Sequence, residues 1–259
     1  MGCCNVVEEE NYIIAEFFID KEHINKKIQI INSFDNIQRK YKKQDKEGEK
    51  YKIESDIKLC EIKVDEEVIP FSYEYIFKTS GKHTIKYTFP NPLTQTSYLF
   101  NDCFSMKEVD LSHFNTQNLT CTNYMFMCSG LESVIFFKYK IEKITEMIGM
   151  FTSCKKLKIF SLPNLKAETY INMDRFFSNC DELENVDLSN FKAKAISMNC
   201  MFYFCKALKN VNLSNLDSKN ANINDIFLGC YLLQKEKVIT KDQNILNKFE
   251  QVVGPSYFS

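Results

Sequence analysis

Cysteine is the residue of this sequence whose number and spacing could support chemistry. The chain of 259 residues holds 11 cysteines but only 3 histidines, His23, His83 and His113. A thiolate can act as a nucleophile or bind a metal, and a catalytic thiol needs a base beside it. The sequence contains no Cys-x-x-Cys pair, no HExxH helix and no glycine-rich phosphate loop. We therefore expect neither an enzyme nor a bound metal or other cofactor.

Six of the cysteines mark an internal repeat. They follow one another at intervals of 25 or 26 residues and are Cys103, Cys128, Cys154, Cys180, Cys205 and Cys230. Five have a phenylalanine three residues earlier, and all but the first have a leucine three residues later. A short apolar alternation such as Val186-Asp187-Leu188 then leads into a polar turn. One such unit cannot bury its apolar side alone, so the repeat predicts a solenoid whose short strands pair in parallel about 4.8 Å apart.

The same geometry bears on the state of the thiols. Equivalent residues of adjacent turns lie about one strand spacing apart and point the same way. We interpret the six repeat cysteines as reduced, buried thiols that fill a small slot, with disulfides between turns and metal ligation as the alternatives. Cys60, Cys121 and Cys200 lie outside the register. A thiol enzyme, the rival hypothesis, would depend on one of these three.

Each predicted strand has one position that should point outward. These positions are Asp110, Ile135, Ser161, Asp187 and Asn212, flanked by the turn residues His113, Tyr139, Asn164, Asn190 and Asn215. Their small or polar character is typical of a solvated surface or of a binding face. We take the row as the candidate face for a protein partner.

The two ends of the chain follow other patterns. Residues 11–95 alternate with period two, and candidate strands at 12–19, 27–31, 57–64, 68–72, 73–78 and 82–89 predict a small β-sandwich. The Lys- and Glu-rich segment 38–52 between them reads as a solvated loop. At the other end, Thr240 and Gln243 have the spacing of a capping box ahead of an amphipathic segment. We therefore expect residues 241–259 to contain a helix that caps the solenoid.

The sequence begins Met1-Gly2-Cys3-Cys4. Glycine exposed by removal of Met1 can be myristoylated, and a neighbouring cysteine can then be palmitoylated. One myristoyl chain anchors only marginally, whereas a second acyl chain makes attachment stable. Val6 departs from the usual acceptor pattern, which has Ser or Thr there. We expect residues 1–10 to be a lipidation segment modified at Gly2, Cys3 and Cys4, and hence a peripheral protein on the cytoplasmic side of a membrane.

Charge and hydropathy exclude two other classes. The chain has 33 basic and 34 acidic side chains, so it lacks the basic excess by which nucleic-acid binders displace counterions from phosphate. No apolar run approaches the roughly 18 residues of a membrane helix, and the start of the sequence lacks the order of a secretory signal. We expect a protein partner, no nucleic acid, and contact with the membrane only through acyl chains.

The repeats resemble a known family. The segments FNDCFSMKEVDLSHFNTQNLT (100–120), FSNCDELENVDLSNF (177–191) and FYFCKALKNVNLSNL (202–216) are similar to the BspA-like leucine-rich-repeat surface proteins of bacteria and protists. The resemblance covers about residues 100–235. In the second and third copies, IFFKY and SLPNL replace the DLSNF turn. The resemblance implies adhesion or protein-binding surfaces and no catalysis.

The expected fold class is therefore an α+β repeat protein in three parts after the lipidation segment. These are a β-sandwich at 11–95, a leucine-rich-repeat-like solenoid of about six turns with a parallel sheet at 96–240, and a C-terminal cap at 241–259. The expected function is a lipid-anchored, non-enzymatic interaction scaffold, and the Lys- and Asn-rich composition is typical of an AT-rich protist genome. The alternatives are a structural component of a larger cortical or ciliary assembly, and a secreted or surface adhesin of the same repeat family.

Overall fold

The computed structural model describes residues 11–41, 50–51, 53–137, 141–163 and 165–252. Its first part contains β1 (Tyr12–Ile19), η1 (Lys21–His23), β2 (Lys27–Gln29), α1 (Phe34–Tyr41), α2 (Glu54–Ile57), β3 (Glu61–Val64), β4 (Glu67–Ile69), β5 (Glu74–Ile76) and β6 (Gly81–Thr88). The second part contains β7 (Met106–Asp110), β8 (Ser133–Ile135), β9 (Ile159–Ser161), β10 (Leu165–Asn172), β11 (Asn185–Asp187), β12 (Phe191–Ser197), β13 (Asn210–Asn212), β14 (Leu216–Asp217), η3 (Lys235–Lys237), β15 (Val238–Ile239) and α3 (Gln243–Val252).

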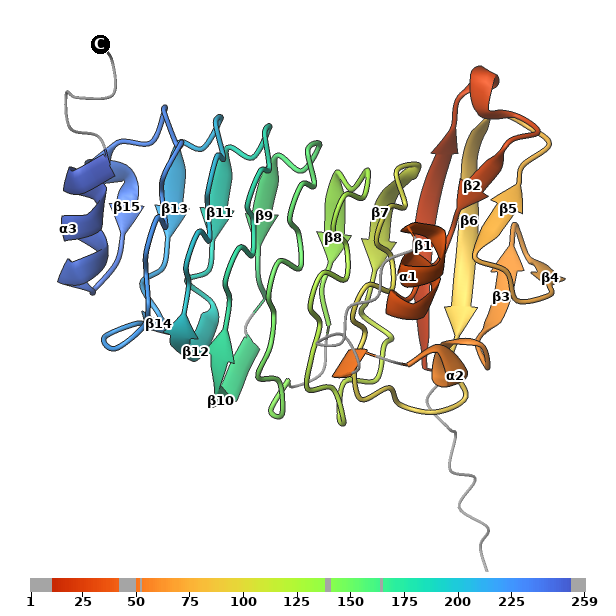
Figure 1. Cartoon of the computed structure of the whole chain (residues 1–259), viewed down its shortest axis with the longest axis horizontal. Helices are drawn as coiled ribbons and strands as arrows, with labels where there is room; N and C mark the ends of the chain where they lie inside the picture. The colour runs from red at the N-terminus through yellow and green to blue at the C-terminus, as the bar shows by residue number, and fades with distance from the viewer. Residues whose placement is uncertain (1–10, 42–49, 52, 138–140, 164, 253–259) are drawn as a thin grey trace, which may run out of the picture.

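The second part is a β-solenoid of about five turns. The period of the sequence predicts this type of fold. One side of it carries the short strands β7, β8, β9, β11, β13 and β15, whose outer surface we call the parallel face (Figure 1). A second side carries the three-stranded sheet β10-β12-β14, which we call the side sheet. The number of turns is smaller than the six expected, because six repeated corners enclose five complete turns.

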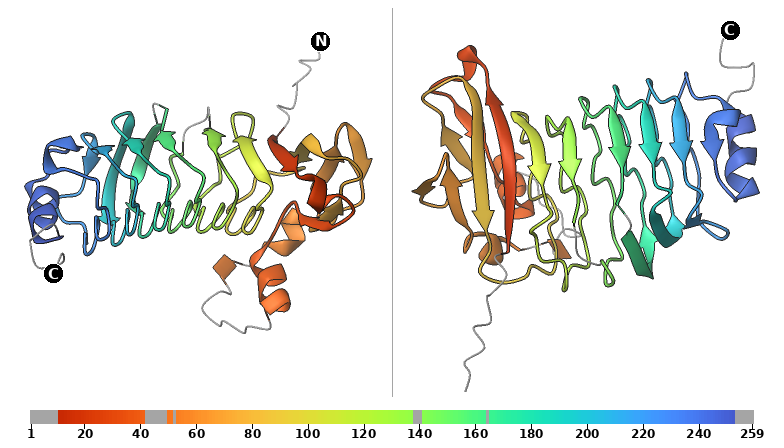
Figure 2. Two further views of the ribbon diagram at one scale, coloured as in Figure 1. Left: turned by 90° about the horizontal axis from the view of Figure 1, so that it is seen from above. Right: turned by 180° about the vertical axis from the view of Figure 1, so that it is seen from behind.

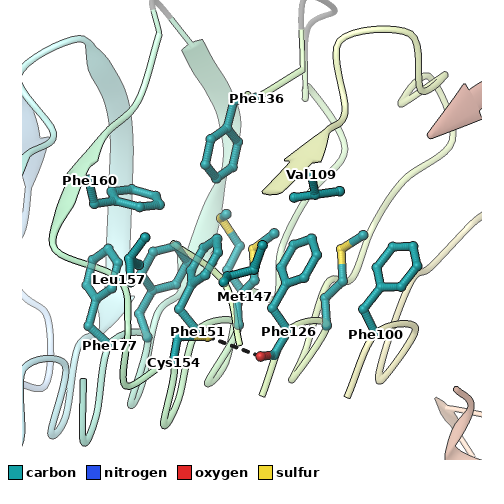
Figure 3. Packing of buried hydrophobic residues seen from close by; sticks show 14 of the residues in the cluster. Phe100, Val109, Phe126, Phe136, Met147, Phe151, Cys154, Leu157, Phe160 and Phe177 are labelled. Carbon is teal, nitrogen blue, oxygen red and sulfur yellow. Dashed lines mark hydrogen bonds between the residues drawn. The ribbon is translucent and has the colours of Figure 1, made fainter. Parts of the chain in front are cut away.

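Stacked phenylalanines form the centre of the solenoid. Rings from successive corners lie nearly parallel with centroids 5.4 to 5.8 Å apart, in the column Phe100, Phe126, Phe151, Phe177, Phe202 and Phe227. Figure 3 shows part of this column beneath the inward residues of the strands, such as Val109 and Phe160. Five of the six rings are fully buried and Phe227 is 1% exposed. The repeat of 25 or 26 residues therefore brings equivalent phenylalanine rings to stacking distance.

The structure does not confirm the predicted separate β-sandwich in the N-terminal part. Strands β4, β3, β6 and β1 are antiparallel neighbours, and β1 also pairs with β7, so that they share one six-stranded sheet with β7 and β8. Among the described strands of residues 11–95, β2 and β5 form a separate two-stranded ribbon. The first sheet continues into the solenoid and covers its open edge (Figures 1 and 2). Helix α1 occupies the beginning of the segment expected to be a loop.

Helix α3 lies at the other end of the solenoid (Figure 1). The preceding β15 pairs in parallel with β13, and Ile245 of α3 is fully buried. The capping box expected from Thr240 and Gln243 does not form. Instead, Asp242 accepts a hydrogen bond from the amide of Asn244 at 2.9 Å, which satisfies one of the unpaired donors at the start of the helix.

Candidate interaction surfaces

Repeat cysteines hydrogen-bond to the backbone of the phenylalanine column. Four thiols donate to the carbonyl of the phenylalanine one turn earlier: Cys154 to Phe126 at 3.1 Å, Cys180 to Phe151 at 3.1 Å, Cys205 to Phe177 at 3.0 Å and Cys230 to Phe202 at 2.9 Å. Figure 3 shows the first of these bonds. Burial raises the pKa of the Cys154 thiol to about 12 and raises the pKa of Cys180 well above its ordinary value. These groups are therefore protonated hydrogen-bond donors and poor nucleophiles.

The second turn departs from the predicted register. Ser129, not Cys128, stands three residues after the stacked Phe126, and Ser129 Oγ lies 3.4 Å from Cys154 Sγ. Cys128 is half-buried and has φ of 59°, as do the residues that precede the slot in the neighbouring turns, Asp102 at 61° and Ser153 at 59°. Cys128 therefore takes the corner position before the slot, because the ring column sets the register and not the cysteine spacing.

Glycine at position 130 permits this departure from the predicted register. A Cβ built on Gly130 would lie 1.9 Å from the carbonyl oxygen of Phe104, far inside any allowed contact. The Gly130 amide donates to the carbonyl of Cys103 at 3.1 Å. The close approach of the two backbones thus depends on the missing side chain.

The cysteines outside the register have no histidine among their hydrogen-bond partners in the described part of the chain. Cys60 is buried and donates to the carbonyl of Glu61 at 3.4 Å, and burial raises its pKa to about 12. Cys121 lies 3.2 Å from Ser97 Oγ, and Cys200 is half-buried. Burial raises the pKa of both of these thiols as well.

The three histidines lie elsewhere. His83 is 7% exposed and its ring nitrogens contact Asp65 Oδ2 at 2.6 Å and the Thr79 carbonyl at 3.0 Å. His113 stacks on Tyr12 with ring centroids 4.6 Å apart, and His23 lies 3.7 Å from Asp20. These positions place the imidazoles at the N-terminal sheet and its junction with the solenoid.

The predicted outward row lies on the parallel face in register. Asp110 is opposite Ile135 in one pair of strands, and Asp187 stands between Ser161 and Asn212 in another. Ile239 of β15 extends the row beside Asn212. Ile135 is 59% exposed and Ile239 is 55% exposed, so apolar side chains face solvent on this surface.

Three members of the row also have a local structural role that the sequence reasoning missed. Asp110, Asp187 and Asn212 each accept a hydrogen bond from the backbone amide two residues later, at 2.7, 2.8 and 3.1 Å. This arrangement is an Asx turn, which helps the chain to leave the strand. One side-chain oxygen of each residue, Oδ1, is therefore already engaged within the turn. The signal available in the sequence was the recurring Asp/Asn-Leu-Ser motif.

Of the flanking turn residues, His113 lies against Tyr12 as described. Asn190 is exposed, and the side-chain amide of Asn215 donates to the carbonyl of Ser189 in the previous turn. Tyr139 and Asn164 lie outside the described residues, as do Gly2, Cys3 and Cys4. The structure therefore bears on neither the lipidation segment nor these two turn positions.

A shallow trough of about 570 Å³ crosses the parallel face over β9, β11, β13 and β15. Ile159, which is 67% exposed, and Ile239 lie among its lining residues, together with Asn185 and Asn210. The two asparagines are joined across the strands, since Asn210 Nδ2 donates to Asn185 Oδ1 at 2.7 Å. The trough thus combines exposed aliphatic groups with an amide pair that retains donor and acceptor capacity.

A second ladder of polar side chains, also missed from the sequence, runs along the corners. Asn199 Oδ1 accepts from the backbone amide of Asn224 in the next turn at 2.9 Å. The backbone amide of Asn199 in turn donates to Asp174 Oδ1 at 2.8 Å. Asn123 Oδ1 likewise accepts from the backbone amide of Ile148 at 2.7 Å. Ile148 has no side-chain oxygen that could continue the ladder to the next turn. The backbone amide of Asp174 donates instead to Asn172 Oδ1 at 2.9 Å.

The repeat part of the chain matches a known family. The family described as "Mycoplasma protein of unknown function, DUF285" matches residues 84–135 and 128–240. The chain belongs to this family. The match spans most of β6, the whole solenoid and β15, and it agrees in broad terms with the resemblance to BspA-like repeats.

The DUF285 region therefore coincides with the turns that carry the phenylalanine column, the thiol slot and the parallel face. A repeat domain of this kind is consistent with a protein-interaction or surface role. No curated protein matches the chain, and no solved structure matches it. Among the described residues, no helix has the length and apolar character needed to cross a membrane.

Proposed function

We propose that this DUF285 protein is a non-enzymatic scaffold that binds a protein partner on the parallel face of its solenoid. The observation that carries the proposal is the trough over β9, β11, β13 and β15, where Ile159 and Ile239 are 67% and 55% exposed. Large exposed aliphatic side chains beside polar ones are typical of interaction sites. The partner would bury the two isoleucines and hydrogen-bond to the asparagine pair 185/210.

Binding rather than catalysis is supported by the state of the thiols. Burial raises the pKa of Cys60, Cys121 and Cys200, so none of them has the depressed pKa of an activated nucleophile. A mild thiol probe should therefore find no hyperreactive cysteine in the native protein. Rapid, stoichiometric labelling of one cysteine at neutral pH would favour a thiol enzyme instead.

The proposal includes a lipid anchor on the cytoplasmic side of a membrane. Its support is the sequence Met1-Gly2-Cys3-Cys4, which offers one myristoylation site and two palmitoylation sites. Metabolic labelling with an alkyne-tagged myristate should modify the native chain and not Gly2→Ala. The Gly2→Ala chain should also move from the membrane pellet to the soluble fraction, and unchanged sedimentation would contradict the anchor.

The binding face is tested by site-specific photocrosslinking in the native cell. A photoreactive amino acid at position 159 or 239 should capture one discrete partner, whereas the same group at Leu59, which is 60% exposed on the N-terminal part, is the control. Ile159→Glu with Ile239→Glu should abolish the crosslink from position 185, with the far-UV circular dichroism unchanged. Equal capture from positions 159 and 59 would remove the parallel face from the proposal.

A further inference from the structure

The corner surface of the last turn departs from the charge pattern of the turns before it. The position directly after the repeat cysteine is charged in three successive turns, and Asp181 lies 3.9 Å from Lys155 on one side and 3.1 Å from Lys206 on the other. In the last turn Tyr231 takes this position and Leu232 follows it. The row of ion pairs along the solenoid therefore ends in an aromatic and an aliphatic side chain.

Apolar side chains gather around this position. Tyr231 and Leu232 are 60% and 55% exposed. The Tyr231 ring meets the ring of Phe204 edge-on with centroids 6.3 Å apart, and Phe204 lies 4.6 Å from the ring of Tyr203. Phe204 also lies directly against Gly229 of the last turn, where a Cβ would meet its ring at 2.8 Å. We call Tyr203, Phe204, Tyr231 and Leu232 the corner patch, and such a group of apolar side chains at the surface marks an interaction site.

The end of α3 lies beside the corner patch. Three residues join β15 to α3, so the helix returns alongside the strand, and it contacts η3, which directly precedes β15. Figure 1 shows the last turn of α3 at the end of the solenoid from which β15 starts. Leu233 and Gln234 separate the patch from η3, a span of at most about 10 Å of extended chain. The chain that follows Val252 therefore begins close to the patch.

The sequence that follows α3 has the composition to cover this patch. Residues 253–259 lie outside the described residues and read Val-Gly-Pro-Ser-Tyr-Phe-Ser, with two aromatic side chains and no charged one. Seven extended residues span at most about 23 Å, which is enough to reach the corner of the last turn. A segment tethered so closely has an effective concentration on the order of millimolar, which favours it over a free partner of the same chemistry.

We propose that residues 253–259 fold back onto the last turn and cover the corner patch with the rings of Tyr257 and Phe258. Aromatic rings favour edge-to-face contacts, and Phe204 and Tyr231 already form one at the patch. The covered turn is the last of the solenoid, so the segment acts together with α3 as its cap. This contact is separate from the parallel face and does not depend on a partner bound there.

Tryptophan fluorescence tests the contact, because the native sequence contains no tryptophan. In the full chain with Phe258→Trp we expect an emission maximum at shorter wavelength than in denaturant, and protection from the soluble quencher acrylamide. Adding Tyr231→Ser with Leu232→Ser should shift the emission to longer wavelength and raise the quenching constant several-fold. Far-UV circular dichroism should stay the same, since both changed residues are exposed. Tyr257→Trp repeats the measurement at the neighbouring ring.

The matched control is Phe104→Ser. Phe104 is 67% exposed and has the position of Tyr231 in the first turn, five turns or about 24 Å away along the solenoid. This change should leave the emission and the quenching constant unchanged. Solvent-exposed emission from both tryptophan variants, or an equal effect of Phe104→Ser, would overturn the proposal. Protection that is lost on dilution would also overturn it, because the occupant would then be a second copy of the chain.

Discussion

The Sγ of Cys180 lies 3.1 Å from the carbonyl oxygen of Phe151, one turn earlier along the solenoid. The bond links the thiol slot to the phenylalanine column and recurs from Cys154 to Cys230. Both partners are fully buried in this pair. A reagent can therefore reach Cys180 only when the turns separate.

Thiol labelling should separate the cysteines into two classes. At pH 8 we expect an alkylating reagent to modify Cys128 and Cys200, which are half-buried, and to leave Cys154 and Cys180 unmodified until denaturant is added. Burial raises the pKa of Cys154 and Cys180, so the reactive thiolate is scarce as well as inaccessible. Mass spectrometry of a chain with Cys3→Ser and Cys4→Ser reads the sites. Native labelling of Cys180 as fast as Cys200 would contradict the buried slot.

Replacing Gly130 by Ala should destabilise the protein strongly. The added Cβ would meet the Phe104 carbonyl oxygen at 1.9 Å, and this backbone cannot move without breaking the ring column. We expect a loss of about 3 kcal/mol in the free energy of unfolding, measured with urea. Gly81→Ala is the control, since no atom lies within 4 Å of its Cβ and only its φ of 111° is strained. A loss for Gly130→Ala no larger than that for Gly81→Ala would show that the contact with Phe104 is relieved at little cost.

The polar ladder along the corners predicts an asymmetric response at position 199. Asn199→Asp keeps the oxygen that accepts from the Asn224 amide, whereas Asn199→Leu leaves that amide without its partner. Because the bond is exposed to water, we expect Leu to lower the free energy of unfolding by about 0.5 to 1.5 kcal/mol and Asp to lower it less. Thermal unfolding followed by circular dichroism compares the variants. A leucine variant as stable as the native chain would argue that water replaces the lost bond.

Stability in acid should depend on Glu54. Hydrogen bonds from Arg39 at 2.5 and 2.9 Å hold the pKa of the Glu54 carboxyl at about 2, below its ordinary 4.5, and Tyr73 Oη also donates to it at 2.6 Å. The contribution is therefore complete above pH 4.5 and is lost as pH falls toward 2. Because Arg39 is 55% exposed and water screens the pair, we expect about 1 to 2 kcal/mol.

The check is the free energy of unfolding of the native chain and of Glu54→Gln between pH 6 and pH 2. The difference between the two should shrink as pH falls through this range, because the native carboxylate becomes protonated and loses its advantage over the amide. Glu108→Gln, at an exposed position of β7, supplies the control curve. A constant difference between native and Glu54→Gln at every pH would mean that charge plays no part.

Helix α3 should act as the end cap that the sequence predicts. Ile245 is fully buried, so Ile245→Asp places a charge where the last turn is covered. We expect a lower midpoint of thermal unfolding and a concentration-dependent loss of monomer, because the parallel edge of β15 becomes available to other chains. Asn244→Asp, exposed in the same helix, should leave both unchanged. Light scattering and thermal unfolding measure the two effects, and a soluble, equally stable Ile245→Asp chain would rule out the cap.

Local pattern was enough to predict several features of this protein. The 25- to 26-residue period requires equivalent side chains to stack, and Phe151, Phe177 and Phe202 do so. Strict alternation located β1 at Tyr12–Ile19, and an amphipathic stretch located α3. These features depend on residues close together in the chain or on exact repetition, so the sequence alone contains them.

Other features were decided only by packing between distant segments. Cys128 gave way to Ser129 in the slot because the ring of Phe126 sets the register, and β1 joined β7 because the first turn exposes unpaired backbone groups that a strand can satisfy. The corner lysine Lys156 meets Glu182 of the next turn, which lies within reach only because the turns stack. A periodic sequence determines which side chains repeat, whereas which surface each copy covers or leaves open depends on neighbours that only the folded chain brings together.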